Sequence, residues 1–184
     1  MYYRDLQKSV KTLEAELEPF EVEFMDRDSF KKFADNLLSE IGGYNQIWIT
    51  GYFSEAIRDS LEMFARSHKL KLLSQEFDLN NKREKKNLEA LRKLCNSGAE
   101  VKVNSRLHAR FLLAHSPEFP AIGLLVIGSF DFNTEGMSRE RYDAGIKTKN
   151  PDLVLSARDL FMKIWAEPES VPLKEKYPAP TVIS

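Results

Sequence analysis

The sequence predicts an α/β sandwich in which a mixed, largely parallel β-sheet is flanked by helices. Short apolar runs of strand length alternate with stretches that carry apolar residues at three- and four-residue spacing. Most of these segments are bounded by glycine, proline or a capping residue. The chain has 184 residues, of which 42% are hydrophobic, so it is long enough to bury one substantial core. This alternation of strands and helices favours a single α/β domain.

The first segments of the chain predict a helix, an edge strand and a second helix. Residues 4–18 form an amphipathic pattern, which either packs on its own domain or makes a dimer contact. Residues 20–25 alternate between apolar and acidic side chains, which is typical of a half-buried edge strand. The next helix is expected to open at Asp28 and to stop at Gly42. Its apolar face consists of Phe30, Phe33, Leu37 and Ile41.

Three strands and two helices are predicted next. The strands cover residues 47–53, 69–74 and 100–103, and each is a short apolar run. Ser54 is expected to cap the first intervening helix. Asn81, followed three residues later by Glu84, resembles a capping box and is expected to open the second.

The last part of the chain predicts further strands, one long helix and a tail. A strand is expected over residues 142–148, and Asn150 followed by Pro151 is typical of a helix start. Prolines are frequent after Glu167, so the tail is expected to be extended or mobile. We therefore divide the chain into an N-terminal helix and edge strand (1–25), a main domain (26–166) and a proline-rich tail (167–184).

Composition and charge limit the classes of function. The formal net charge of −1 gives no overall attraction to nucleic acid, so a polyanion site must be a local basic patch. No apolar run approaches the ~20 residues that span a bilayer. The N-terminal residues also lack the apolar core of a signal peptide, which predicts a cytoplasmic protein without membrane partners. The single Cys95 excludes an intrachain disulfide and a cysteine-rich zinc site.

Polar residues in two apolar runs indicate a functional site. His108 and Arg110 stand two apart in the run of residues 107–115, so a strand would place both on one face, about 6–7 Å apart. Ser129 and Asp131 have the same spacing at the end of the next apolar run. Four such side chains pointing one way from neighbouring strands are unusual in a core.

These residues resemble the signature of the phospholipase D superfamily, which reads His-x-Lys, four residues, Asp, then Gly-Ser-x-Asn and a later acidic residue. His108, Gly128, Ser129 and Asp143 match it. Arg110 replaces the lysine, His115 the aspartate and Asp131 the asparagine. The resemblance covers roughly residues 26–166 and implies a phospholipase D-like sandwich.

The resemblance also implies a chemistry that requires no metal or other cofactor. His108 would attack the phosphorus, and Arg110 and Ser129 would hold the phosphate oxygens. Asp143 would accept a hydrogen bond from the imidazole of His108 and fix its tautomer. Asp131 is the departure that matters, because an ionised aspartate repels phosphate and can pair with Arg110 instead.

Enzymes of this superfamily use two motifs at one site, and this sequence carries one. On a continuous strand His115 would face away from His108, about 23 Å along, and His68 has no partner pattern. The second histidine is therefore expected from another subunit, which predicts a homodimer. We expect a phosphodiesterase, and a nuclease in preference to a lipase. The sequence does not decide whether the substrate is DNA, RNA or a small diester. The alternatives are a catalytically degenerate module that binds nucleic acid or phosphate, and a structural subunit of a larger complex.

Overall fold

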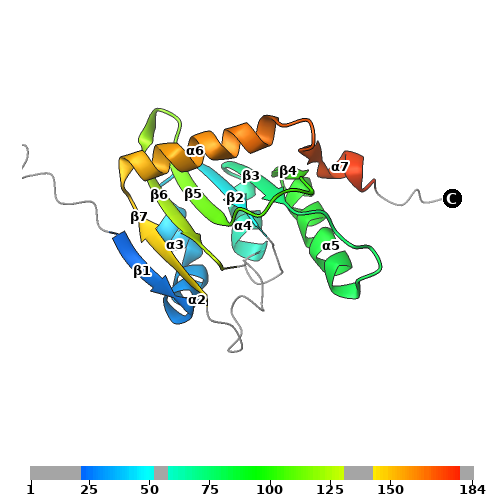
Figure 1. Ribbon diagram of the computed structural model, residues 1–184, viewed down its shortest axis with the longest axis horizontal. Coiled ribbons are helices and arrows are strands. Elements are labelled where there is room, and N and C mark those ends of the chain that lie inside the picture. The colour runs from blue at the N-terminus through cyan, green and yellow to red at the C-terminus, as the bar shows by residue number, and fades with distance from the viewer. Residues whose placement is uncertain (1–21, 52–57, 131–142, 179–184) are drawn as a thin grey trace, which may run out of the picture.

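The computed structural model describes residues 22–51, 58–130 and 143–178, which form an α/β sandwich. Eight strands make one sheet in the order β1-β7-β6-β5-β2-β3-β4-β8. Figure 1 shows the long helix α6 running across the strands on one side, with helices α2 to α5 on the other. The predicted fold class, a mixed sheet flanked by helices, is confirmed.

The strands have these bounds: β1 Val22–Asp26, β2 Gln46–Thr50, β3 Lys69–Ser74, β4 Glu100–Val103, β5 Phe111–Ser116, β6 Phe119–Gly128, β7 Ala144–Thr148 and β8 Val171–Pro172. The helices are α2 Arg27–Asp35, α3 Leu37–Ile41, α4 Arg58–Ala65, α5 Lys82–Asn96, α6 Pro151–Ala166 and α7 Leu173–Lys176. Within the described parts of the chain, none of the helices combines the length and the apolar character needed to span a bilayer.

The prediction of a largely parallel sheet is wrong. Only β2-β3 and β3-β4 pair in parallel, whereas the other five pairings of the described strands are antiparallel. The reason is visible in the element order. Helices α4 and α5 separate β2, β3 and β4 and provide the crossovers that parallel neighbours need. From β5 to β7 no helix of the described chain intervenes, and consecutive strands then pair as antiparallel neighbours.

Side-chain caps explain where the helices begin. Asp26 accepts a hydrogen bond from the backbone N–H of Ser29 (2.8 Å), so the cap of α2 lies two residues before the expected one at Asp28. The helix expected from Asp28 to Gly42 is interrupted at Asn36 and forms both α2 and α3. Asn150 caps α6 as predicted, with Pro151 in its first turn.

Asn81 caps α5 as predicted, but the capping box is not closed. The Asn81 side chain accepts from the N–H groups of Arg83 and Glu84. The Glu84 carboxylate accepts from the N–H of Asp78 instead of Asn81. The predicted cap at Ser54 and the predicted helix over residues 4–18 lie outside the described residues.

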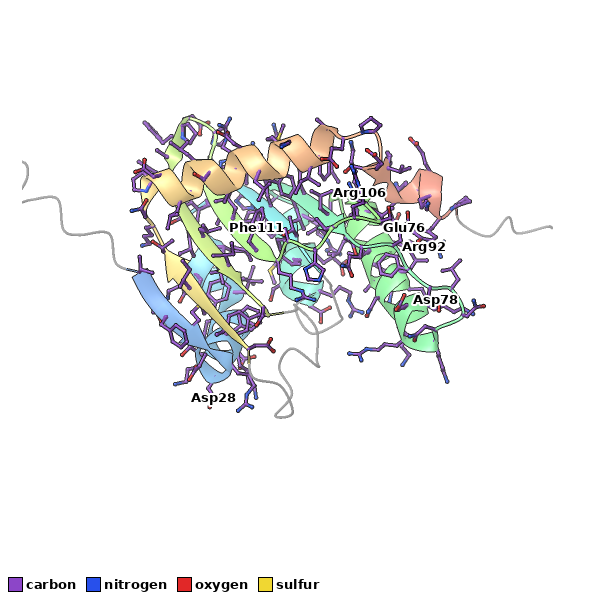
Figure 2. All side chains as sticks on the ribbon, in the orientation of Figure 1. Asp28, Glu76, Asp78, Arg92, Arg106 and Phe111 are labelled. Carbon is purple, nitrogen blue, oxygen red and sulfur yellow. The ribbon has the colours of Figure 1, made fainter. Side chains whose placement is uncertain are left out.

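The sheet separates two apolar cores. Along β5, Leu112 and Ala114 point toward α2 to α5, whereas Phe111 and Leu113 point toward α6. Alternation of this kind is what a strand with two covered faces requires. Phe111 packs edge-on against Phe161 of α6 (ring centroids 6.3 Å apart), and Figure 2 shows it beneath that helix.

The tail is ordered over residues 171–178, contrary to the expectation of an extended or mobile segment. β8 pairs with β4, and Leu173 of α7 is 1% exposed. The hydroxyl of Tyr177 accepts from the N–H of Phe77 (2.8 Å) and lies 3.3 Å from its carbonyl oxygen. Prolines are frequent in loose tails, yet Pro172 lies in an edge strand, a position that tolerates a residue without a backbone N–H.

Candidate active site

The segment that carries His108 and Arg110 precedes a strand instead of forming one. The strand expected over residues 107–115 begins only at Phe111. The backbone before it is held by side chains: Gln75 Nε2 donates to the carbonyl of Leu107 (2.5 Å), and Thr50 Oγ1 accepts from the N–H of Phe111 (3.0 Å). Because Thr50 and Phe111 are both fully or nearly buried, this bond fixes the start of β5.

Ser129 and Asp143 are brought together where β6 ends and β7 begins. Ser129 Oγ donates to Asp143 Oδ1 (2.7 Å) and accepts from the N–H of Ala144 (3.2 Å). The N–H of Ser129 donates to the carbonyl of Ala144 (3.0 Å). Two residues that are 14 positions apart in the sequence are thereby locked side by side.

Two glycines make this approach possible. A Cβ atom added to Gly128 would lie 2.6 Å from the carbonyl oxygen of Ala144, and one added to Gly145 would collide with the carbonyl of Ile127. Neither contact can be relieved by moving a flexible side chain, because the opposing atoms are backbone. Sequence reasoning singled out Gly128 through the motif and missed Gly145, whose signal was a glycine inside an otherwise regular strand.

Arg110 lies beside this pair. Its Nη1 is 3.5 Å from the carbonyl oxygen of Ser129. Gly51 also lies next to Arg110, and a Cβ atom at Gly51 would be in ordinary contact with Arg110 Cγ (3.6 Å). Gly51 has a φ of +135°, which disfavours other residues, so glycine is required here by the backbone conformation and not by lack of space. It was not among the predicted site residues.

His108 is exposed and lies two residues before Arg110 on the same segment. It lines a hollow of about 330 Å³ together with Arg106, Ile164 and Glu167. The imidazole makes no hydrogen bond to any described residue, so the expected bond from His108 to Asp143 is not formed in this structure; Asp143 accepts from Ser129 instead.

A polar network behind His108 fixes its segment to the end of α6. Asn104 Nδ2 donates to Ser170 Oγ (2.9 Å), and its Oδ1 accepts from the N–H of Arg106. The guanidinium of Arg106 pairs with Glu167 (3.0 Å) and Glu169 (3.2 Å), and Figure 2 shows Arg106 near the C-terminal end of α6. These residues were missed. The only signal was that Asn104, followed by Ser105, could form a turn after a strand.

The two remaining motif positions do not join this cluster. Asp131 lies outside the described residues. His115 is 2% exposed at the other end of β5 and faces the α6 side, where its ring packs edge-on against Trp48 (4.5 Å between centroids). Burial lowers the pKa of His115 below its ordinary value of 6.5, partly opposed by the Ser116 backbone and reinforced by the charge of Arg158.

The architecture is that of a phospholipase D-like α/β sandwich. Among solved structures, Nuc from Salmonella typhimurium, a phospholipase D family member, superposes with a TM-score of 0.63 at 15% identity, over 84% of this chain and 97% of Nuc. NucT from Helicobacter pylori superposes with a TM-score of 0.61 at 16% identity, over 84% of this chain and 99% of NucT. The chain therefore has the fold of the phospholipase D superfamily.

A third similar structure is TrmBL2, an archaeal chromatin protein whose structure shows a novel mode of DNA binding. It superposes with a TM-score of 0.51 at 16% identity, over 92% of this chain and 63% of TrmBL2. No family model matches the sequence, and no curated protein is significantly similar to it. At these levels of identity the structural similarity establishes the fold alone.

Proposed function

We propose that this protein is a metal-independent phosphodiesterase that cleaves nucleic acid through a phosphohistidine intermediate. The observation that carries the proposal is the grouping of Arg110, Ser129 and Asp143 at one end of the sheet, with His108 exposed two residues away. A guanidinium and a hydroxyl next to an exposed imidazole are the groups that a phosphoryl displacement needs.

In the proposed reaction, an imidazole nitrogen of His108 attacks the phosphorus and the bond to the leaving oxygen breaks. The leaving oxygen takes a proton from a second imidazole, which acts as a general acid. Water then attacks the phosphohistidine, gives its proton back to that imidazole, and releases the phosphate monoester and His108. Arg110 stabilises the charge on the non-bridging oxygens throughout.

The second imidazole has to come from another copy of the chain. The sequence contains three histidines. His115 is buried at the far end of β5, and His68 lies at that same end, because Lys69 and His115 both pair with Gln46. We therefore infer a homodimer in which two His108 side chains meet near a two-fold axis.

The test is hydrolysis of labelled single- and double-stranded DNA and RNA, and of an aryl phosphodiester, in the presence of EDTA. We expect cleavage by the wild type and its loss in His108→Ala. His68→Ala is the matched control, because it removes the same side chain at the opposite end of the sheet, and it should cleave normally. Cleavage that survives in His108→Ala, or that EDTA abolishes, would contradict the proposal.

The second candidate is a module that binds nucleic acid or phosphate without cleaving it. It is favoured by the sequence departure at Asp131, where the resemblance implies an asparagine, and by the Asp143 carboxylate, which accepts a hydrogen bond from Ser129 and places negative charge beside that hydroxyl. The similarity to TrmBL2 is compatible with such a role. Binding without cleavage by the wild type, combined with cleavage by Asp131→Asn, would support this candidate.

A further inference from the structure

A second hollow, at the opposite end of the sheet, contains groups that the proposed reaction does not use. It has a volume of about 370 Å³ and lies between α6 and the ends of β2, β3 and β5. The lining includes His115, which occupies the aspartate position of the motif. Arg110 and His115 are five positions apart on extended chain, which corresponds to about 17 Å. The hollow is therefore distinct from the candidate active site.

Two aromatic side chains that line this hollow have unused hydrogen-bonding groups. Trp48 is 5% exposed and His115 is 2% exposed. The indole Nε1 of Trp48 and both ring nitrogens of His115 are buried without a hydrogen-bond partner among the described residues. Leaving one such group unpaired costs about 1–3 kcal/mol, and buried polar atoms in folded proteins are almost always satisfied. Three unpaired nitrogens in adjoining rings point to an absent partner.

The charged residues around the hollow indicate the sign of the charge that the absent partner carries. Lys69, Lys71 and Arg158 line it, against the single carboxylate of Glu100. Glu100 forms an ion pair with Lys71 (3.7 Å), and Arg158 forms a weak ion pair with its neighbour Asp159 (3.6 Å). Lys69 is exposed and forms no ion pair with any described residue. An excess of positive charge together with N–H donors is suited to an oxyanion.

We propose that this hollow binds a phosphate monoester, whose oxygens accept hydrogen bonds from Trp48 and His115 and pair with Lys69 and Arg158. The buried rings close the hollow on the sheet side, so a terminal phosphate can enter it. An internal phosphodiester would need room for two continuing chains at the same opening. Met162 and Arg158, the α6 side chains that line the hollow, are long and unbranched and can move as the ligand enters.

The test is ¹H–¹⁵N NMR of the full chain during titration with inorganic phosphate, compared with chloride at equal ionic strength. The chain has two tryptophans, so the two indole N–H signals can be assigned with Trp165→Phe. We expect the Trp48 signal to shift with saturation under phosphate and to remain in place under chloride. An equal, non-saturating drift with both salts would overturn the proposal.

Two variants distinguish phosphate binding at this hollow from non-specific electrostatic attraction to the protein surface. Lys69→Gln changes an exposed side chain, so the protein remains folded, and it should weaken phosphate binding about five-fold, the equivalent of about 1 kcal/mol for one exposed charge pair. Lys31→Gln makes the same change of charge on the exposed surface of α2 and should leave binding unchanged. Equal binding by both variants would exclude the hollow as the site.

A second titration identifies the kind of phosphate. A nucleoside 5′-monophosphate should shift the Trp48 signal, whereas a dinucleoside phosphodiester should not. The diester is added to His108→Ala, so that cleavage cannot generate a monoester during the measurement. Equally tight binding of the diester would overturn the assignment to a monoester. Neither titration measures hydrolysis, so this proposal and the proposed function can fail independently.

Discussion

At the scale of single residues, the hydroxyl of Ser129 connects three groups of the candidate site. The hydroxyl donates to Asp143 and accepts from the backbone N–H of Ala144. The backbone carbonyl of the same residue lies next to the guanidinium of Arg110. In the proposed reaction this hydroxyl must turn from Asp143 to a phosphate oxygen. In that proposal the hydroxyl contributes to catalysis more than to folding, because the group is exposed.

Ser129→Ala is expected to reduce kcat for phosphodiester cleavage by about 100-fold, the usual cost of removing one donor to a developing negative charge. The free energy of unfolding should change by less than about 1 kcal/mol, since the lost hydrogen bonds are exposed. Ser39→Ala, at an exposed position of α3, is the control and should change neither quantity. A loss of stability that matches the loss of activity would assign Ser129 a structural role.

His115 should make the stability of the protein depend on pH. Burial lowers its pKa in the folded state, so between that pKa and about 6.5 the unfolded chain binds more protons. The free energy of unfolding is therefore not reduced by His115 above pH 6.5. As the pH decreases below that value, protonation of this group in the unfolded chain lowers the free energy of unfolding by at most about 1.4 kcal/mol per pH unit.

Urea unfolding at pH 7.5 and pH 5.5 measures this effect. The difference in the free energy of unfolding between the two pH values should shrink in His115→Phe relative to the wild type. An unchanged difference in His115→Phe would show that other groups cause the pH dependence.

Residue-level prediction from the sequence succeeded where the chemistry is local. The caps of Asn81 and Asn150 were predicted because each depends on the few residues that follow it. The hydrogen bond between Ser129 and Asp143 was not predicted, because the two residues are 14 positions apart and no local pattern links them. The family resemblance pointed to both residues but implied a bond from His108 to Asp143 instead. The partners of Asn104 and Arg106 lie more than 60 residues away, which no local pattern reveals.

At the scale of secondary-structure elements, the pairing of β6 with β7 decides where the site residues lie. The two strands approach closely because Gly128 and Gly145 stand opposite each other. Sequence patterns located β3 and β4 at their observed bounds, because buried strands are short apolar runs. They placed the start of β5 too early, because Leu107 is as apolar and as buried as the strand that follows.

Gly128→Ala should test this close approach. The added methyl group would lie 2.6 Å from the carbonyl oxygen of Ala144, so the strands must separate, at a cost of about 1–3 kcal/mol in the free energy of unfolding. The displacement should also remove activity by detaching Ser129 from Asp143. Gly43→Ala, where nothing lies within 4 Å of the new atom, should have little effect in the same unfolding and cleavage assays. Full activity in Gly128→Ala would contradict this account.

At the scale of the whole molecule, the proposed site is half of a shared one. One subunit supplies a single usable imidazole, so activity should require two copies of the chain. An excess of the inactive His108→Ala protein, allowed to exchange subunits with the wild type, should therefore inhibit cleavage as mixed dimers form. His68→Ala in the same excess should not inhibit. Activity that stays proportional to the wild-type subunits would refute a shared site, as would a monomer in sedimentation velocity.

The ends of the sheet were the least predictable part of the molecule. The edge strand β1 was expected from its alternation, whereas β8 was not, because two residues carry no periodic pattern. The balance of parallel and antiparallel pairs depends on which strands are separated by helices, and this becomes clear only when all elements are located. The three-segment division of the chain remains a prediction, although residues 171–178 pack on the main sheet.

The position of β8 has a consequence for how the chain behaves among other copies of itself. An open sheet ends in strands whose unpaired N–H and C=O groups can accept a further strand. Here β8 covers β4 with two residues, one of which is a proline without an N–H, and the chain then turns into α7. The last strand is thus too short and too poor in donors to extend the sheet, and the tail protects the protein from edge-to-edge aggregation on that side.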